Sequence, residues 1–186
     1  MILEKIKTSL TTEINPKINN YGKNKLASVL IIIYDNPPKI LMTKKPISMA
    51  QHGGEISFPG GKYIEADNDL LETAIRETKE ETGLVISKSD VIGQLNQVTT
   101  LNSGFTIIPF VCVLDKISNL VKNSEVEIFL QIPLVTLLET LENDIDPNHN
   151  SIQEMYIFTF KKNLIWGASA RMLKQVKDNL TKESSV

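Results

Sequence analysis

Three glutamates near the middle of the chain have the residue type and spacing of a divalent cation site. Glu80 lies three residues after Glu77 and Glu81 lies four after it, so in a helix their side chains occupy neighbouring positions on one face. Like charges at this spacing destabilise an isolated helix by roughly 0.2–0.5 kcal/mol each. Mg²⁺ would relieve that repulsion, because it binds one or two carboxylates and completes its shell with waters and substrate phosphates. The glutamates therefore indicate metal-dependent phosphate chemistry.

Charged helix faces of this kind are most often just solvent-exposed surface. Here the residues around the glutamates favour a ligand-binding site instead. Arg76 can pair with Glu72 or Glu80 at four-residue spacing and so fix the orientation of the carboxylates. Gly60 and Gly61, which precede the acidic stretch, let the backbone approach a ligand closely. This combination predicts a phosphate-binding cradle beside the carboxylates.

Other phosphate and hydrolase motifs fit the sequence poorly. Gly61 and Lys62 do not belong to a P-loop, because the required glycine five residues before Gly61 is missing and Tyr63 follows where Ser or Thr should bind metal. No Gly-x-Ser-x-Gly motif is present. A single cysteine, Cys112, and two histidines nearly a hundred residues apart give no common zinc spacing, so oxygen ligation of Mg²⁺ or Mn²⁺ is favoured.

The hydrophobic pattern predicts the elements that must position these residues. Asp69 can cap a helix over residues 70–82 with Glu72 as its capping-box partner, and Gly83 suits the position after its end. An apolar, branched run at 26–34 reads as a buried strand that turns into a second strand at 39–43. Further strands are expected at 91–99, 106–114, 126–132 and 153–160, and further helices at 2–14, 134–141 and 168–180. The mixture favours an α/β or α+β layered domain.

Length and composition limit the number of domains, the class of partner and the cellular compartment. The chain has 186 residues, 41% of them hydrophobic, and a net charge of −2, which fits one globular domain. A nearly neutral charge argues against nucleic acid or an anionic membrane as the main partner. The lone cysteine suits a reducing compartment, and neither a signal-type apolar segment nor a run long enough to span a bilayer is found. A cytoplasmic protein is expected, and a homodimer is compatible with the sequence.

The acidic stretch resembles the Nudix box, the signature of hydrolases that act on nucleoside diphosphates linked to another moiety. The resemblance rests on Gly61, Asp67 and the run from Arg76 to Leu84. Three positions depart from the usual box, because Asp67 stands in for the first glutamate, one extra residue precedes Arg76, and Thr78 replaces an aliphatic residue. The intact Arg-Glu-x-x-Glu-Glu-x-Gly end is the part that carries the metal chemistry in the family.

Residues upstream of the box are similar to the additional motif of coenzyme A pyrophosphatases within that family. The motif covers Leu41 to Pro46, Met49, His52, Gly54 and Phe58 to Gly61. Lys45 stands where these enzymes have arginine, and a lysine cannot make the bidentate phosphate contact of an arginine. Two further segments, 109–111 and 165–173, are also similar to this family, so the resemblance extends over roughly residues 26 to 175.

The resemblance implies an α/β/α sandwich with a mixed sheet, formed by a single Nudix domain over residues 1–186. Within it, residues 1–22 would be an N-terminal helical extension, 58–84 the Nudix box and 168–180 a C-terminal helix. The implied reaction is attack of water, assisted by Mg²⁺ or Mn²⁺, on the pyrophosphate of coenzyme A or a derivative. Its products are 4′-phosphopantetheine and adenosine 3′,5′-bisphosphate.

The resemblance also implies roles for individual residues. The metal ligands would be Glu77 and Glu81, with Glu80 next, and one of the three carboxylates would accept the proton of the attacking water. The implied catalytic residues are Glu80, Glu77 and Arg76, and the implied substrate-binding residues are Lys45, His52, Gly60 and Gly61. His52 is equally explained by a bond to a backbone carbonyl.

Three alternatives remain open at this level. The first is a Nudix hydrolase with another substrate, such as ADP-ribose, a nucleotide sugar or a dinucleoside polyphosphate. The second is a catalytically silent Nudix domain that senses a nucleotide, and the third is an interaction domain whose acidic helix is only surface.

Glu125 and Glu127 lie where some Nudix enzymes hold an extra metal ligand or base, but an edge strand with alternating charges explains them as well. Trp166 is expected to pack in the core.

Overall fold

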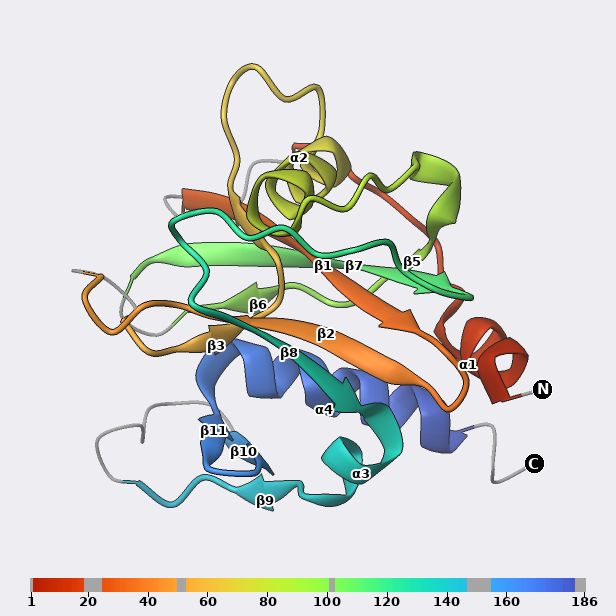
Figure 1. Ribbon diagram of the computed structural model, residues 1–186. Coiled ribbons are helices and arrows are strands. Elements are labelled where there is room, and N and C mark those ends of the chain that lie inside the picture. The colour runs from red at the N-terminus through yellow and green to blue at the C-terminus, as the bar shows by residue number, and fades with distance from the viewer. Residues whose placement is uncertain (1, 19–24, 50–52, 101–102, 147–154, 183–186) are drawn as a thin grey trace.

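A mixed sheet lies between helices on both of its faces (Figure 1). This computed structural model describes residues 2–18, 25–49, 53–100, 103–146 and 155–182. One face is covered by α2 (Leu70–Thr82), and the other by α1 (Ile2–Leu10), α3 (Leu134–Glu139) and α4 (Gly167–Lys182). The α/β/α sandwich expected from the sequence is confirmed. None of the helices in these ranges has the length and apolar character that crossing a bilayer requires.

The sheet is built around β1 (Lys25–Tyr34), which runs parallel to β7 (Phe105–Leu114) and antiparallel to β2 (Lys39–Lys44). The outer strands all pair antiparallel with one of these three: β3 (Ile56–Ser57) and β8 (Ile128–Pro133) with β2, β4 (Gly60–Lys62) with β1, and β5 (Val91–Gln94) and β6 (Val98–Thr99) with β7. A separate small sheet contains β9 (Glu142–Asn143), β10 (Tyr156–Phe160) and β11 (Asn163–Ile165), and a short 3₁₀ turn, η1, spans Lys88–Asp90.

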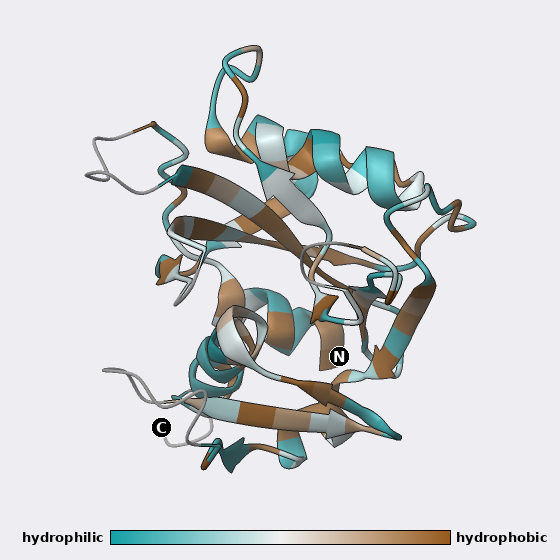
Figure 2. Ribbon diagram, turned by 90° about the vertical axis from the view of Figure 1, so that its left-hand side faces the viewer, coloured by the Kyte–Doolittle hydropathy of each residue, from teal (hydrophilic) through white to brown (hydrophobic). Residues whose placement is uncertain are grey.

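The side chains of β1 alternate between two cores, one on each face of the sheet. Ile31 and Ile33 pack toward α1, α3 and α4, whereas Leu30 and Ile32 pack toward α2. Because both faces are covered, the strand is continuously apolar from Val29 to Ile33, and Figure 2 shows such brown strands between helices with teal outer faces. Cys112 is buried in the core under α2.

The helix that carries the glutamates begins and ends where the sequence predicts. Asp69 accepts a hydrogen bond from the backbone N–H of Glu72 at 2.7 Å, and Gly83 adopts a left-handed conformation with φ of 74° while its N–H bonds the Lys79 carbonyl. The second half of the predicted capping box is wrong, because the Glu72 carboxylate accepts from Asn68 instead of from the Asp69 backbone.

Other elements differ from the prediction at their ends. The helix predicted over 2–14 stops at Leu10, after which Thr12 exchanges hydrogen bonds with Gln94 beside β5. The strand predicted over 91–99 is divided into β5 and β6, and the strand predicted from 126 begins at Ile128. The short strands β3 and β4 were not predicted, because two or three residues carry no periodic signal. Residues 153 and 154 of the strand predicted over 153–160 lie outside the described residues.

Two buried threonines of α2 allow a matched test of packing on the glutamate helix. The Thr78 hydroxyl is buried without a hydrogen-bond partner among the described residues, whereas the Thr73 hydroxyl donates to Asp67 Oδ2 at 2.8 Å. Because valine has nearly the same shape, we expect Thr78→Val to raise the free energy of unfolding by about 1 kcal/mol, and Thr73→Val to lower it by about as much. Urea denaturation measures both. A loss of stability in Thr78→Val equal to that in Thr73→Val would contradict this account.

Candidate active site

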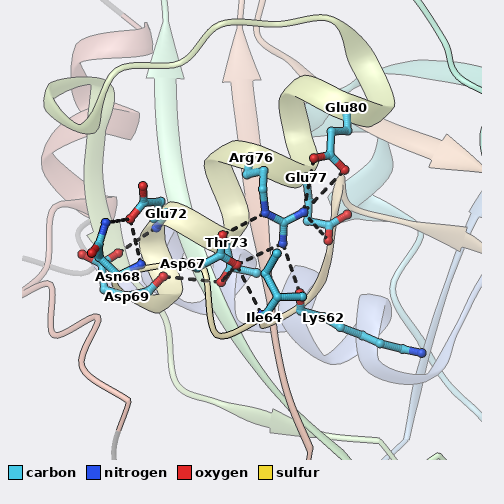
Figure 3. A network of polar contacts seen from close by, with 10 residues as sticks. All are labelled: Lys62, Ile64, Asp67, Asn68, Asp69, Glu72, Thr73, Arg76, Glu77 and Glu80. Atoms are coloured by element: carbon cyan, nitrogen blue, oxygen red, sulfur yellow. Dashed lines mark hydrogen bonds and ion pairs between the residues drawn. The ribbon is translucent and has the colours of Figure 1, made fainter.

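An ion pair between Arg76 and Asp67 organises the carboxylates (Figure 3). Arg76 Nε donates to Asp67 Oδ1 at 2.8 Å and its Nη2 donates to Oδ2 at 3.0 Å, a bidentate contact. The Arg76 guanidinium, together with the Thr73 hydroxyl and the Ile64 N–H, holds the pKa of the Asp67 carboxyl below its usual range against the effect of burial. Asp67 therefore lies in the structure as a buried anchor, 5% exposed, that fixes the guanidinium.

The remaining nitrogen of Arg76 reaches the glutamates. Its Nη1 donates to Glu77 Oε1 at 2.9 Å and lies 3.4 Å from both oxygens of Glu80. The sequence predicts Glu72 or Glu80 as the helix partner of Arg76, and the structure shows that it is Glu80, because the Glu72 carboxylate accepts from Asn68. The side chain of Glu80 is 54% exposed, so it is held less firmly than Glu77.

The two glycines of β4 are required by their neighbours on opposite sides of the strand. A Cβ at Gly61 would lie 2.7 Å from Glu77 Oε1 and closer to the other carboxylate atoms. A Cβ at Gly60 would overlap the carbonyl oxygen of Ser28, and its φ of 153° is one that other residues rarely adopt. With no side chain in the way, the Gly60 N–H donates to Glu81 Oε2 at 3.2 Å. The glycines predicted to form a cradle thus contact two of the three glutamates.

Glu81 is a buried carboxyl, only 2% exposed. Its burial raises its pKa to about 7, and the neighbouring charges of Glu77 and Glu125 act in the same direction, whereas the Lys45 ammonium and the Gly60 N–H oppose the shift. Burial also raises the pKa of Glu77, although Arg76 counteracts it. The site therefore contains carboxyls that are costly to ionise in the absence of a further cation.

Lys45 approaches these carboxyls from the end of β2. Its Nζ lies 3.6 Å from Glu125 Oε2 and it stabilises the charged form of Glu81. Glu125 arrives there because the loop before β8 is tied to β2 by the Glu127 N–H, which donates to the Lys44 carbonyl. The sequence alone does not place Glu125 in the site, since its proximity depends on the pairing of two distant strands.

The donor set fits a hard divalent cation in its chemistry. Oxygen ligands from Glu77, Glu80 and Glu81 are available beside a backbone cradle that any Cβ would fill. Within the described ranges, however, no three acidic, histidine or cysteine side chains already converge in a ligating arrangement. Glu77 and Glu80 contact Arg76, and Glu81 contacts the Gly60 N–H.

A pocket of about 490 Å³ opens on the face of the sheet that α4 covers. Its walls come from β1, β3, β4, β7 and the start of α4, and they include Lys45, Gly60, Gly61, Phe105, Trp166 and Arg171. Trp166, expected to pack in the core, is only partly buried and lines this pocket. His52, a predicted substrate-binding residue, lies outside the described residues.

Comparison with known proteins gives consistent results. A sequence profile described as "NUDIX domain" matches residues 24–174. The protein named "Uncharacterized Nudix hydrolase NudL" of Yersinia enterocolitica is 32% identical over 154 residues, which are 81% of this chain and 78% of the relative.

Solved structures share the fold at low sequence identity. A MutT/nudix family protein from Enterococcus faecalis has a TM-score of 0.63 at 14% identity, and the match covers 89% of this chain and 65% of that longer protein. A bifunctional NMN adenylyltransferase/ADP ribose pyrophosphatase from Francisella tularensis, solved with AMP and a Mn ion, has a TM-score of 0.50 at 16% identity and matches over 72% of this chain and 38% of its own.

The raised pKa of Glu81 predicts how stability depends on pH without metal. The pKa of Glu81 is about 7 in the folded protein and has its ordinary value of 4.5 in the unfolded chain. Between these two pH values the folded protein binds more protons than the unfolded chain. The free energy of unfolding therefore falls as the pH rises through this window. We expect Glu81→Gln to remove this loss and, at pH 8 in EDTA, to raise the free energy of unfolding by about 2 kcal/mol. Urea denaturation at pH 5 and pH 8 measures the effect. The more exposed Glu80→Gln is the matched control, and equal pH slopes in Glu81→Gln and the parent protein would refute the explanation.

The close approach of Gly61 to Glu77 predicts coupled stabilities. Because the new methyl group must displace the carboxylate, Gly61→Ala should lower the free energy of unfolding by about 1–3 kcal/mol. In a Glu77→Ala background the obstacle is gone, and the same glycine substitution should cost clearly less. Thermal denaturation of the parent protein, the two single variants and the double variant completes this double-mutant cycle. Additive losses of stability would show that the two residues do not touch as described.

Proposed function

Because this chain belongs to the NUDIX domain family, we propose that it is a metal-dependent pyrophosphohydrolase of coenzyme A or its derivatives. One observation carries the proposal. Carboxylates fixed by Arg76 lie on one side of the glycine strand β4, and a pocket large enough for a nucleotide opens on the other side. A diphosphate bound along the glycines would thus lie between the acidic side chains and the pocket.

Mg²⁺ or Mn²⁺ would be held by Glu77 and Glu81, with Glu80 as the next ligand. The burial of Glu81 beside Glu77 and Glu125 supports this, since these charges are poorly balanced by Lys45 alone. A Mn ion accompanies AMP in the Francisella tularensis structure of the same fold. When bound, such an ion neutralises phosphate charge and lowers the pKa of a coordinated water.

The residues of the chain would then divide the remaining work. Arg76, anchored on Asp67, orients the glutamates, and the Gly60 and Gly61 backbone lets the diphosphate come close. Lys45 donates to a phosphate oxygen. Water attacks one phosphorus, the bridging P–O bond breaks toward the other phosphate, and a carboxylate accepts the proton of the water. Glu80 is the best candidate for that proton, because it is the most exposed of the three and makes only long contacts with Arg76.

Coenzyme A is proposed over other nucleoside diphosphates because of the residues that form the pocket wall. The stretch similar to the coenzyme A pyrophosphatase motif covers β2 from Leu41 on, β3 and the first residues of β4. Four of the motif residues line the pocket: Lys45, Phe58, Gly60 and Gly61. ADP-ribose is the alternative, because the Francisella tularensis neighbour is named as an ADP ribose pyrophosphatase.

We also propose that the whole chain acts as one Nudix domain with an N-terminal extension. The family profile begins at residue 24, but Leu3, Ile6 and Leu10 of α1 are buried in the same core as α4. This shared core supports treating the first helix as part of the folded unit.

The proposal predicts the products of a simple incubation. With coenzyme A and Mg²⁺, mass spectrometry should find 4′-phosphopantetheine and adenosine 3′,5′-bisphosphate, and Glu81→Gln should lower the rate at least about 100-fold because a metal ligand is lost. Glu142→Gln, on β9, is the control acid-to-amide change and should leave the rate unaltered.

ADP-ribose and a diadenosine polyphosphate belong in the same assay. Cleavage of either of these without cleavage of coenzyme A would refute the substrate assignment. A folded Glu81→Gln protein with parental rates would refute the role of Glu81.

A further inference from the structure

Two lysines from neighbouring strands flank one aromatic ring at the edge of the pocket. Lys25 Nζ lies 5.8 Å and Lys62 Nζ 5.6 Å from the centroid of the Phe105 ring. Their strands place them there, because Lys25 is directly opposite Phe105 in the β1–β7 register and Lys62 is opposite Ala27 in the β1–β4 register. Ala27 follows Lys25 by two residues, so all of these side chains share one face of the sheet.

That face is the pocket face. Ala27, Phe105 and Lys62 line the pocket, whereas Gly61, one residue earlier on β4, faces Glu77. Figure 3 shows the same division at Lys62, whose side chain extends away from the carboxylates while its carbonyl accepts from Arg76 Nη2 at 3.3 Å. Lys62 therefore serves the pocket and not the glutamates.

Neither lysine has an acidic partner in the described part of the chain, although other lysines such as Lys39 and Lys174 do form ion pairs. Two ammonium groups beside one ring repel each other, and within the described residues the weak attraction to the ring is the only contact that either ammonium group makes. An anion would relieve the repulsion. The position at the rim of a nucleotide-sized pocket selects a ligand whose anionic group is carried on a larger molecule.

Hydroxyl groups and a third cation complete this corner. Thr100 and Ser103 line the pocket beside Phe105, and Ser103 Oγ donates to Thr100 Oγ1 at 2.8 Å. From the opposite wall, Arg171 of α4 lines the pocket and donates to the Thr99 carbonyl. Burial lowers the pKa of Arg171, so a nearby anion would favour its charged form. The Thr100 hydroxyl donates in turn to the Phe105 carbonyl, so both hydroxyl protons are already used and the cationic side chains are the groups that an anion would contact here.

We propose that Lys25 and Lys62 bind a phosphomonoester on the nucleoside half of the substrate, separate from the diphosphate that is cleaved. The assignment rests on the proposed function, under which the diphosphate lies along Gly60 and Gly61. Lys62 follows Gly60 by two strand residues, about 7 Å. That distance allows Lys62 to reach a second phosphate on the nucleoside whose diphosphate lies at Gly60. In coenzyme A this second group is the 3′-phosphate. The two lysines thus determine specificity for nucleotides phosphorylated on the ribose.

Binding of two nucleotides tests the subsite without catalysis. Titration calorimetry should show that the protein binds adenosine 3′,5′-bisphosphate about tenfold more tightly than adenosine 5′-monophosphate, the gain expected from charge-assisted hydrogen bonds. Lys25→Gln/Lys62→Gln should abolish this preference and leave the affinity for the monophosphate unchanged. Lys116→Gln, an exposed lysine after β7, is the control and should retain the preference. Equal affinities in the parent protein, or a preference that survives the double substitution, would overturn the proposal.

Kinetics separate a failure of the subsite from a failure of the proposed function. The double variant should raise KM for coenzyme A about tenfold with little change in kcat, and it should leave KM for 3′-dephospho-coenzyme A unaltered. Hydrolysis of both substrates with the same KM in the parent protein would reject the subsite and retain the enzyme. Preference for the bisphosphate in calorimetry without hydrolysis of coenzyme A would reject the enzyme assignment and retain the subsite.

Discussion

The ion pair of Arg76 and Asp67 is the constraint on which the arrangement of the site depends. Asp67 lies on the loop before α2 and is nearly inaccessible to water, so its charge is tolerated only while Arg76 and Thr73 satisfy it. Removing one partner of such a pair costs about 3–5 kcal/mol, because the other charge stays buried. The same guanidinium holds Glu77, so the anchor of the loop and the orientation of the acidic residues are one structural feature.

The strand β4 separates two environments by the alternation of its residues. Gly61 presents no side chain toward α2, which leaves room for the Glu77 carboxylate, and Lys62 extends to the opposite face beside Phe105. Because a strand places successive residues on opposite faces, three residues suffice to put an acidic cluster and a basic pocket rim within one short segment. The Lys62 ammonium is thereby kept on the pocket side of the strand, away from the Glu77 carboxylate, whereas Lys45 is the pocket residue that reaches the acidic side chains.

The sequence predicted those parts of the site that depend on local rules. The ends of α2 follow from Asp69 and Gly83, and the shared face of the three glutamates follows from helical spacing. Contacts between distant segments were not predictable in this way. Asp67 is brought to Arg76 by the course of a loop, and Glu125 is brought to Lys45 by pairing of β8 with β2. The position of Lys62 beside Phe105 depends on the register of β4, a strand too short to be recognised from the sequence.

The burial of Glu81 shows why stability and function make opposing demands on this helix. An ionised carboxylate that is almost excluded from water destabilises the folded chain, and the nearby Glu77 and Glu125 increase that effect. Lys45 offsets it only in part, because the same ammonium also pairs with Glu125. A helix selected for stability alone would carry a neutral residue here. Under the proposed function, the acid at this buried position, next to a backbone that approaches through glycine, would hold a cationic ligand whose binding makes the ionised state favourable.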